Sequence, residues 1–470
     1  MQIHLTDIEN AATRIATFAC DFRPTRLTDT DLDLCGRSLA DTYAVAVAGR
    51  GEHAPLAALA YLSRAGLLHN HAGQGASLWG RTERAAPEIA AWWNGIAGHV
   101  LDYDDVTVPM RGHPSVVLWP ALLALAEDRG LMGDRLSSAF TVGMEVIGKL
   151  SRAMALPHYA AGWHSTATIG ALGAAVACCH LLDLNASQIV HAIGIAVAQA
   201  AGTRENVGSE GKSFQAGHAN AVAVRAASLA EAGFEAGPGA LDGPNGFLAL
   251  YAGDDAPHDW LAGLGEAPLE LRRSGLDVKQ YPMCYATHRA LDAVLALRAS
   301  HDIRLADVER VEITTSHGAL VPLVHPNPRT GLEGKFSMPY AMAAALKDGA
   351  IRLTSFVDAS VQRPDIQAFF PRVRATESAG PATPRWAEIT ITLRDGRQLH
   401  QRVQTLRGSA QQPMDAAELA AKLDDCLAWT GVAARGPELL ALAQQCHARP
   451  ARALITDLQA IVASAVKETA

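Results

Sequence analysis

Hydrophobic positions recur at the spacing of an α-helix over most of the first 260 residues. Apolar side chains return every three or four positions, which gathers them on one face of a helix. Many of them are alanine or glycine, so neighbouring helices have room to approach closely. The spacing predicts helices over the segments 53–68, 87–102, 114–128, 134–155, 165–182, 185–202 and 218–234.

The pattern changes near residue 270. The stretch RVEITTSH (310–317) is rich in β-branched residues, which is typical of a strand. The stretch WAEITITLRDGRQLHQRVQT (386–405) alternates apolar and polar positions on both sides of Asp395–Gly396, and this pattern predicts a β-hairpin. A helical segment at 339–349 lies between these strands, and helical spacing returns from Met414 onward.

These elements predict a mainly α protein with two domains. A large all-helical domain is formed by residues 1–269 and 410–470, and an α+β lid domain, residues 270–409, is inserted between its two segments. A chain arranged in this way leaves a cleft between the domains, which is a common place for a ligand.

Composition and charge narrow the possible partners. Hydrophobic residues make up 49% of the chain and charged residues 19%, so a large core is expected rather than disorder. The formal net charge is −8 and no long run of Lys or Arg occurs, which argues against nucleic acid as a partner.

Membrane insertion and secretion are also not expected. The uncharged segment 165–182 is rich in Gly and Ala and contains His180, so it is interpreted as an interior helix rather than a membrane span. The seven cysteines are scattered without a CxxC pair, and the first 18 residues lack a basic start followed by an apolar stretch. Reduced thiols and a cytoplasmic location are therefore expected.

The stretch HVLDYDDVTVPMRGHPS (99–115) concentrates titratable groups between two apolar segments. It is either a solvated loop or one wall of a site. Its DYDD motif lacks the glycine and glutamate positions of a calcium loop, so we expect no metal there. The chain also has no GxxxxGK[ST], no HExxH and no GxGxxG after a strand, and we expect no cofactor.

Other candidate residues stand in apolar or small-residue surroundings. They are His164 in HYAAGWHSTATIG, Lys212 in SEGKSFQAG, Lys279 and His288 in KQYPMCYATH, and Tyr340 after KFSMP. Each alone is more often structural, as a helix-capping His or a surface Lys. Together they suggest a cationic site for a multiply charged anion, in which a His or Lys removes a proton α to a carboxylate.

Several blocks of the chain resemble the MmgE/PrpD family, in the same order. They are GHVLDYDD and GHPS (98–115), AGWHSTATIGALGAA (161–175), GKSFQAG (211–217), LDGPNGF (241–247), VKQYPMCYATH (278–288) and KFSMPYAMAAAL (335–346). The resemblance implies a helical domain, an α+β lid, an active site between them, a homodimer, and chemistry on small polycarboxylates without a metal.

Candidate roles follow from this resemblance and from the charge pattern. We expect catalytic roles for Asp102, His113, His164, Lys212 and Tyr340, and substrate-binding roles for Arg111, Lys279 and His288. The acidic cluster's neighbours Asp104 and Asp105 are interpreted as helix-capping residues or as partners that orient basic side chains.

The favoured hypothesis is a lyase that abstracts an α-proton from a small di- or tricarboxylate, of the 2-methylcitrate dehydratase type. One alternative is an epimerase of the iminodisuccinate type, because the sequence PMRGHPS (109–115) is closer to the sequence of those members. Others are a decarboxylase of the cis-aconitate type and a non-catalytic carboxylate-binding protein. Decarboxylase members place a Thr directly after the acidic cluster, where this chain has Val106.

Overall fold

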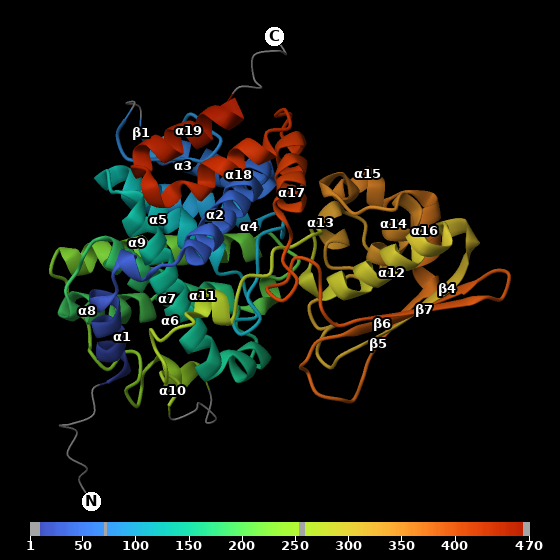
Figure 1. Cartoon of the computed structure of the whole chain (residues 1–470), viewed down its shortest axis with the longest axis horizontal. Helices are drawn as coiled ribbons and strands as arrows, with labels where there is room; N and C mark the ends of the chain where they lie inside the picture. The colour runs from blue at the N-terminus through green and yellow to red at the C-terminus, as the bar shows by residue number, and fades with distance from the viewer. Residues whose placement is uncertain (1–9, 70–72, 253–258, 464–470) are drawn as a thin grey trace, which may run out of the picture.

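The computed structural model describes residues 10–69, 73–252 and 259–463 (Figure 1). The buried hydrophobic residues form two separate cores. The first core draws on residues between Ala11 and Leu276 and between Met414 and Val462, joined by Leu353. The second draws on residues between Tyr281 and Leu399. The predicted mainly α fold with a smaller α+β part is confirmed. The exact domain boundaries stay predictions, and their outer ends at 1–9 and 464–470 lie outside the described residues.

The helical part contains both ends of the described chain. Its N-terminal segment contributes α1 (Ala11–Asp21), α2 (Asp29–Gly49), α3 (His53–Arg64), α4 (Pro87–His99), α5 (Ser115–Arg129), α6 (Gly133–Ala160), α7 (Ser165–Leu181), α8 (Ala186–Val197), α9 (Gly211–Glu231), α10 (Phe247–Tyr251) and α11 (Glu270–Arg273). The C-terminal segment adds α17 (Ala416–Trp429), α18 (Gly436–Gln444) and α19 (Ala451–Ala463), which pack on α2 and α5. A small sheet of β1 (Leu68–His69), β3 (Arg84–Ala85) and β2 (Ala76–Ser77) lies beside them.

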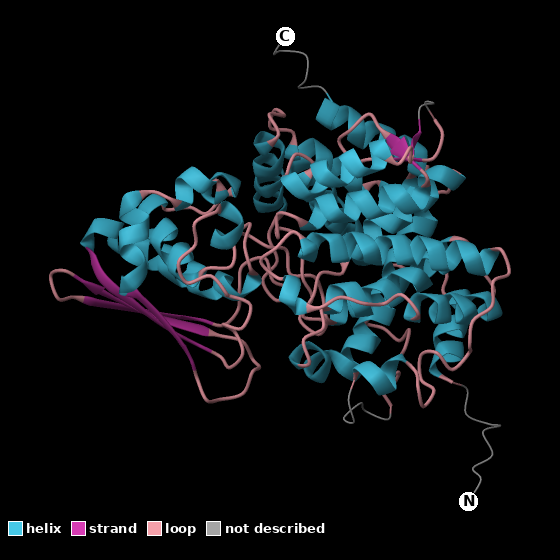
Figure 2. Cartoon of the chain, turned by 180° about the vertical axis from the view of Figure 1, so that it is seen from behind, coloured by secondary structure: helices cyan, strands magenta, loops and turns pink. Residues whose placement is uncertain are grey.

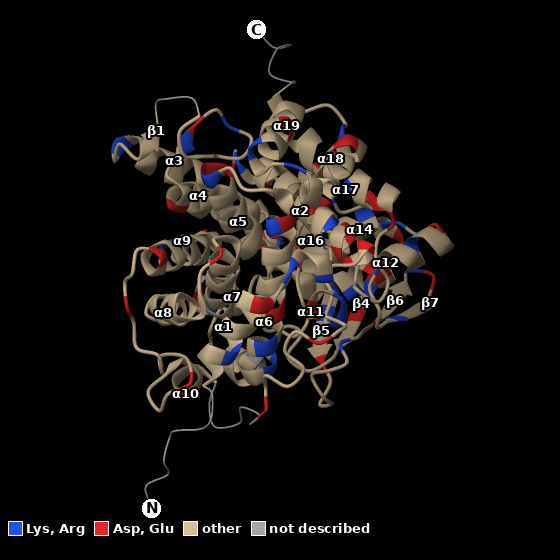
Figure 3. Ribbon diagram, turned by 60° about the vertical axis from the view of Figure 1, so that its left-hand side comes forward, with Lys and Arg blue, Asp and Glu red and all other residues tan. Residues whose placement is uncertain are grey.

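Small residues let the central helices approach closely. A Cβ atom added to Gly95 of α4 would lie 2.9 Å from the Cα of Gly217 of α9, so neither helix tolerates a side chain at this crossing. Helix α7 carries no Lys, Arg, Asp or Glu and is drawn entirely without charged residues in Figure 3. No helix of the described residues is long and apolar enough to cross a membrane, which agrees with the interpretation of 165–182 as an interior helix.

A buried asparagine replaces a backbone hydrogen bond that is missing from α5. Pro120 lies inside this helix and has no N–H to donate to the carbonyl of Val116. Asn220 of α9 donates from Nδ2 to that carbonyl at 2.8 Å, and its Oδ1 accepts from the N–H of Ala121 at 3.0 Å. The two central helices are therefore joined by an amide that is fully buried.

The α+β part is a four-stranded sheet covered by helices. Its strand order is β5 (Val373–Glu377), β4 (Val308–Thr315), β6 (Ala387–Leu393) and β7 (Gln398–Val403), and only the β4–β5 pair is parallel. Helices α12 (His288–His301), α14 (Met338–Asp348) and α16 (Pro364–Phe369), with the single turns α13 (Gly331–Gly334) and α15 (Asp358–Val361), lie on one side of it (Figure 2).

The hairpin predicted at Asp395–Gly396 is confirmed as β6–β7. The edge strand β5 escaped the sequence analysis because it pairs in parallel with β4, 58 residues or more earlier in the sequence, and has only five residues. Strand β4 was predicted from its β-branched residues, and Val308, Val311 and Ile313 face the second core as expected for a half-buried strand.

We expect the substitution Asn220→Leu to lower the free energy of unfolding by about 2–4 kcal/mol, because it leaves a buried carbonyl and a buried N–H without partners. Urea unfolding followed by circular dichroism measures this loss. The control is Asn185→Ala, which removes an exposed N-cap of α8 and should cost only about 1 kcal/mol. Equal losses in the two variants would contradict the bridging role of Asn220.

Candidate functional site

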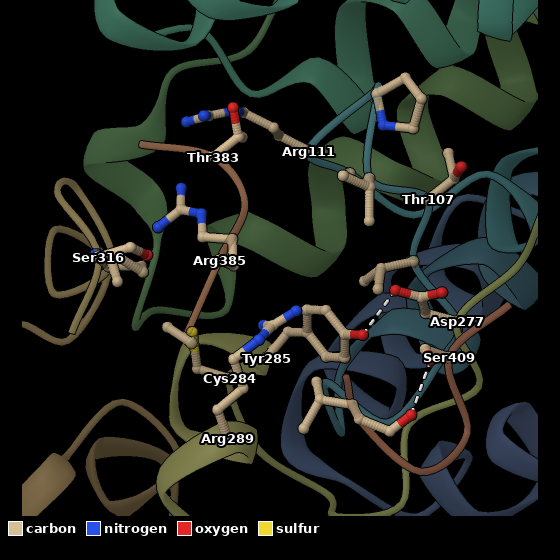
Figure 4. A pocket seen from close by; sticks show the side chains of 18 of the residues that line it. Thr107, Arg111, Asp277, Cys284, Tyr285, Arg289, Ser316, Thr383, Arg385 and Ser409 are labelled. Atoms are coloured by element: carbon tan, nitrogen blue, oxygen red, sulfur yellow. Dashed lines mark hydrogen bonds between the residues drawn. The ribbon is translucent and has the colours of Figure 1, made fainter. Parts of the chain in front are cut away.

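A cavity of about 520 Å³ lies between the two cores. Its walls come from the loop between α4 and α5, the start of α9, the crossover segment 277–289, and the segments 315–322, 383–387 and 404–411 of the second part. Figure 4 shows part of this lining, including the hydrogen bond from the Tyr285 hydroxyl to Asp277. The predicted cleft between the domains is therefore present in the described residues.

Buried lysines from three separate segments of the chain hold the loop at 101–105. Three successive carbonyls each accept a hydrogen bond from a lysine Nζ: Leu101 from Lys335 at 2.7 Å, Asp102 from Lys279 at 2.7 Å, and Tyr103 from Lys422 at 2.9 Å. These lysines are no more than 5% exposed. Because unpaired buried ammonium groups are very costly, this arrangement fixes the loop firmly in place.

The carboxylate of Asp102 lies between two ammonium groups. Its Oδ1 is 2.5 Å from Nζ of Lys212, at the start of α9, and 3.0 Å from Nζ of Lys279. Burial alone would raise the pKa of Asp102, but the charges of Lys212 and Lys279 outweigh it and hold the pKa well below its usual range. Burial would lower the pKa of Lys212, yet Asp102 raises it, so this lysine stays charged.

His113 lies beside this ion cluster and against a second carboxylate. Its Nδ1 is 3.1 Å from Oδ2 of Asp104, and its Nε2 is 3.8 Å from Oδ1 of Asp102. The same Asp104 oxygen accepts a hydrogen bond from Nδ1 of His99 at 2.7 Å. Asp104 thus orients both imidazoles, as the sequence analysis suggested for this residue. Burial lowers the pKa of His113, so its ring is mainly neutral at pH 7.

His164 has a defined tautomer. The Nε2 of Gln215 donates to the carbonyl of Thr203 at 3.1 Å, so the Oε1 of Gln215 must accept from Nδ1 of His164, at 2.7 Å. The Nε2 of His164 is consequently the unprotonated nitrogen. Burial lowers the pKa of His164 well below its ordinary value and keeps the ring neutral. The cavity is therefore lined by two neutral imidazoles, His113 and His164.

Asp105 has the helix-capping role considered in the sequence analysis. Its carboxylate accepts from the hydroxyl of Ser115 at 2.5 Å and from the backbone N–H of Ser115 at 3.3 Å, at the start of α5. Burial raises the pKa of Asp105 to about 8. The interpretation of the stretch 99–115 as a solvated loop does not hold, because Asp102, Asp104 and Asp105 are at most 3% exposed.

The structure brings most of the predicted residues together, but not all. Asp102, Arg111, His113, His164, Lys212 and Lys279 all line the cavity. Tyr340 does not: it is fully buried on α14, packs against Phe356, and donates its hydroxyl to the carbonyl of Ser355. His288 also lies away from the lining, where its Nε2 donates to the carbonyl of Met283. We therefore treat both as structural residues.

Three residues of the site, one behind the cavity wall and two in its lining, were missed by the sequence analysis. Lys335 opens the block KFSMPY, so the block did carry a signal, but its lysine rather than its tyrosine reaches the loop at 101–105. Arg204 and Arg385 line the cavity from separate segments, each as a single arginine without a motif. Only the fold brings such isolated residues together, so no local pattern could have identified them.

One group of side chains in the described part of the chain has the composition of a cation site. Ligand atoms of His99, Asp104 and His113 lie within 4.8 Å of one another. The contacts of Asp104 with the two imidazoles already account for this proximity. The charge of Lys212 acts on both rings and would repel a metal ion, so these residues fit a polar cluster centred on Asp104 better than a metal centre.

A mainly helical part, an α+β part and a cavity rich in basic side chains between their cores define a class of two-domain proteins. Residues 13–259 match the MmgE/PrpD N-terminal domain and residues 281–445 match the MmgE/PrpD C-terminal domain, so the chain belongs to the MmgE/PrpD family.

Its similar relatives include cis-aconitate decarboxylases. The protein from Mus musculus is 30% identical over 375 residues, which cover 74% of this chain and 73% of the relative. The protein from Homo sapiens is 29% identical over 74% of each chain. The protein from Aspergillus terreus is 26% identical over 329 residues, which cover 64% of this chain and 65% of the relative.

We expect Asp102→Asn to lower the free energy of unfolding by about 3–5 kcal/mol, because it leaves two buried ammonium groups without their shared counter-charge. Thermal and urea unfolding measure the loss. The matched control is Asp395→Asn, which breaks the exposed Asp395–Arg397 pair on the hairpin and should leave stability unchanged. A wild-type stability for Asp102→Asn would show that the lysines do not depend on this carboxylate.

Proposed function

We propose that this protein is a lyase that acts on a small di- or tricarboxylate through a carbanion formed next to a carboxylate. One observation carries the proposal. Neutral His113, oriented by Asp104, lies within 4 Å of a carboxylate that is itself held by two ammonium groups. A neutral imidazole beside fixed cations is suited to move a proton while the cations stabilise the enediolate charge.

Each residue has a distinct task in this proposal. The Nε2 of His113 takes up or returns the proton at the α-carbon. The ammonium group of Lys212 binds the adjacent carboxylate and stabilises its growing negative charge. Asp102 and Lys279 position Lys212, and the bare Nε2 of His164 accepts a hydrogen bond from the substrate or a second proton.

Two lyase reactions share this carbanion. In decarboxylation, the bond to the departing carboxylate breaks with release of CO₂, its electron pair stays on the carbon, and His113 in its protonated form then donates a proton there. In dehydration, His113 removes the proton and Lys212 donates one to the departing hydroxide. Similarity to proteins named cis-aconitate decarboxylase favours the first reaction, and the dehydratase of the 2-methylcitrate type remains the second candidate.

An epimerase is supported by a separate observation. Inversion at a carbon requires one group that removes the proton and another that returns it to the opposite face. His113 and His164 are both neutral and both line the cavity, from different elements.

We further propose that the protein is a cytoplasmic homodimer with the α+β part acting as a lid, as the family resemblance implies.

We expect deuterium exchange to distinguish these reactions. The protein is incubated in D₂O with cis-aconitate, 2-methylcitrate and iminodisuccinate, and products are followed by NMR and mass spectrometry. A new C–D bond with release of CO₂ indicates decarboxylation, an alkene product indicates dehydration, and wash-in with inverted configuration indicates epimerisation. Activity should survive EDTA. Absence of exchange and turnover with all three compounds would refute the proposed lyase and support a non-catalytic binder.

We expect His113→Asn to lower kcat by roughly 10²–10⁴-fold with folding intact. The pH profile provides a second readout. Burial lowers the pKa of His113 below 6.5, so its base form dominates at pH 7. If His113 removes the proton, as in dehydration, kcat/KM should fall only below pH 6.5. If protonated His113 donates the proton, as in decarboxylation, kcat/KM should instead fall as the pH rises through this pKa. In either case the limb should disappear in the variant. A limb centred above pH 7, or one that persists in His113→Asn, would assign the proton transfer to another group.

The matched control for this test is Tyr340→Phe. The variant removes one buried hydroxyl from the Ser355 carbonyl and keeps the ring against Phe356, so kcat should stay within about threefold of wild type while stability falls by about 1 kcal/mol. A large loss of kcat in Tyr340→Phe would return this tyrosine to the catalytic set.

A further inference from the structure

A second group of cations lines the cavity apart from the lysines around Asp102. It consists of Arg111 from the loop between α4 and α5, Arg204 from the short 3₁₀ turn before α9, and Arg385 from the segment before β6. Arg204 and Arg111 lie over the ring of Tyr159, with Cζ at 4.0 Å and 5.6 Å from its centroid. Figure 4 shows the side chains of Arg111 and Arg385 directed toward the same part of the pocket.

None of these arginines forms an ion pair with a described residue. None of the three guanidinium groups has a carboxylate within 4.0 Å or donates a hydrogen bond to another described residue, and Nε of Arg204 is buried without a partner. Arg152 and Arg273, which line the same cavity, instead pair with Glu270. The charges of Arg204 and Arg385 act unfavourably on Arg111, and without a directly paired carboxylate this repulsion is relieved when an anion binds among them.

The backbone holds Arg111 at a fixed offset from the proton-transfer group. Arg111 has a φ of 52°, in the left-handed region that a residue with a side chain seldom adopts. The turn is closed by the pairing of Thr107 with Gly112, and the N–H of His113 donates to Oγ1 of Thr166 at 3.2 Å. One residue separates Arg111 from His113, so their Cα atoms are at most about 7 Å apart.

We propose, on the basis of the function proposed above, that Arg111, Arg204 and Arg385 form a subsite for the carboxylates remote from the reacting carbon, and that it selects tricarboxylates over dicarboxylates. Arginine is suited to this task because its planar fork binds carboxylates in a bidentate manner. Lys212 and Lys279 share the single charge of Asp102 and so hold one further carboxylate. The remaining negative charges of a tricarboxylate then fall to the three arginines.

Calorimetric titration with unreactive probes tests the subsite without relying on turnover. Propane-1,2,3-tricarboxylate is compared with pentanedioate, and inorganic phosphate is the third probe. Wild type should bind the tricarboxylate at least 10-fold more tightly than pentanedioate. In Arg111→Met, Arg204→Met and Arg385→Met the tricarboxylate Kd should rise about 10–100-fold, while the Kd of pentanedioate, which presents one remote carboxylate fewer to the arginines, should rise less. Arg385→Lys, which keeps the charge without the fork, should show an intermediate loss.

The control variant is Arg273→Gln, whose guanidinium lines the same cavity but is paired with Glu270, and it should keep the wild-type preference. Thermal unfolding verifies that each variant is folded. An unchanged ratio of the two Kd values in all three arginine variants would overturn the subsite, as would phosphate that binds as tightly as the tricarboxylate. His113→Asn should keep the preference for the tricarboxylate over pentanedioate, so loss of turnover and loss of selectivity can be measured separately. If every turnover assay fails while this preference is intact, the proposed lyase activity is refuted and the proposed subsite is not.

Discussion

The burial of several lysines around one loop is the constraint on which the rest of this structure depends. Lys212, Lys279, Lys335 and Lys422 come from four elements and converge on residues 101–103. An isolated ammonium group inside a protein is too costly to retain, so the helical bundle, the crossover segment and the C-terminal helix α17 must all be in place before these charges are satisfied. The site is therefore built at the meeting point of the chain's distant segments.

The buried lysines also help to hold the two parts of the molecule in a fixed relative position. Lys335 belongs to the α+β part, and it donates to the carbonyl of Leu101 in the helical part and to the carbonyl of Pro282 in the crossover segment. The backbones of Val106 and Asp277 also exchange hydrogen bonds at 3.0 and 2.8 Å across the same junction. The cavity wall is thus fixed by polar contacts, whereas the packing of small residues fixes the bundle behind it.

The sequence identified the parts of this design that are local. Helical spacing located most of the bundle, and the Asp395–Gly396 pair located the hairpin. Asp102 and His113, which were expected to form one wall of a site, are buried and line the cavity. Tyr340 was misjudged because its block points to the site through Lys335, while the tyrosine lies on the buried face of α14. Arg204 and Arg385 do not belong to a recognisable sequence motif. Their place in the site could not be predicted, because only the fold brings them close to Arg111.

The lysines around Asp102 also act on the protonation of the neighbouring His113. Burial and the positive charges of Lys212 and Lys279 lower the pKa of His113, which keeps the imidazole ready to accept a proton. An anion bound beside these cations would offset their charge and raise the pKa of the same ring. By linkage, such an anion and a proton on His113 favour each other, so the site becomes a better proton acceptor when a carboxylate occupies it. The same buried cations can therefore bind an anion and make the proton affinity of His113 depend on whether that anion is bound.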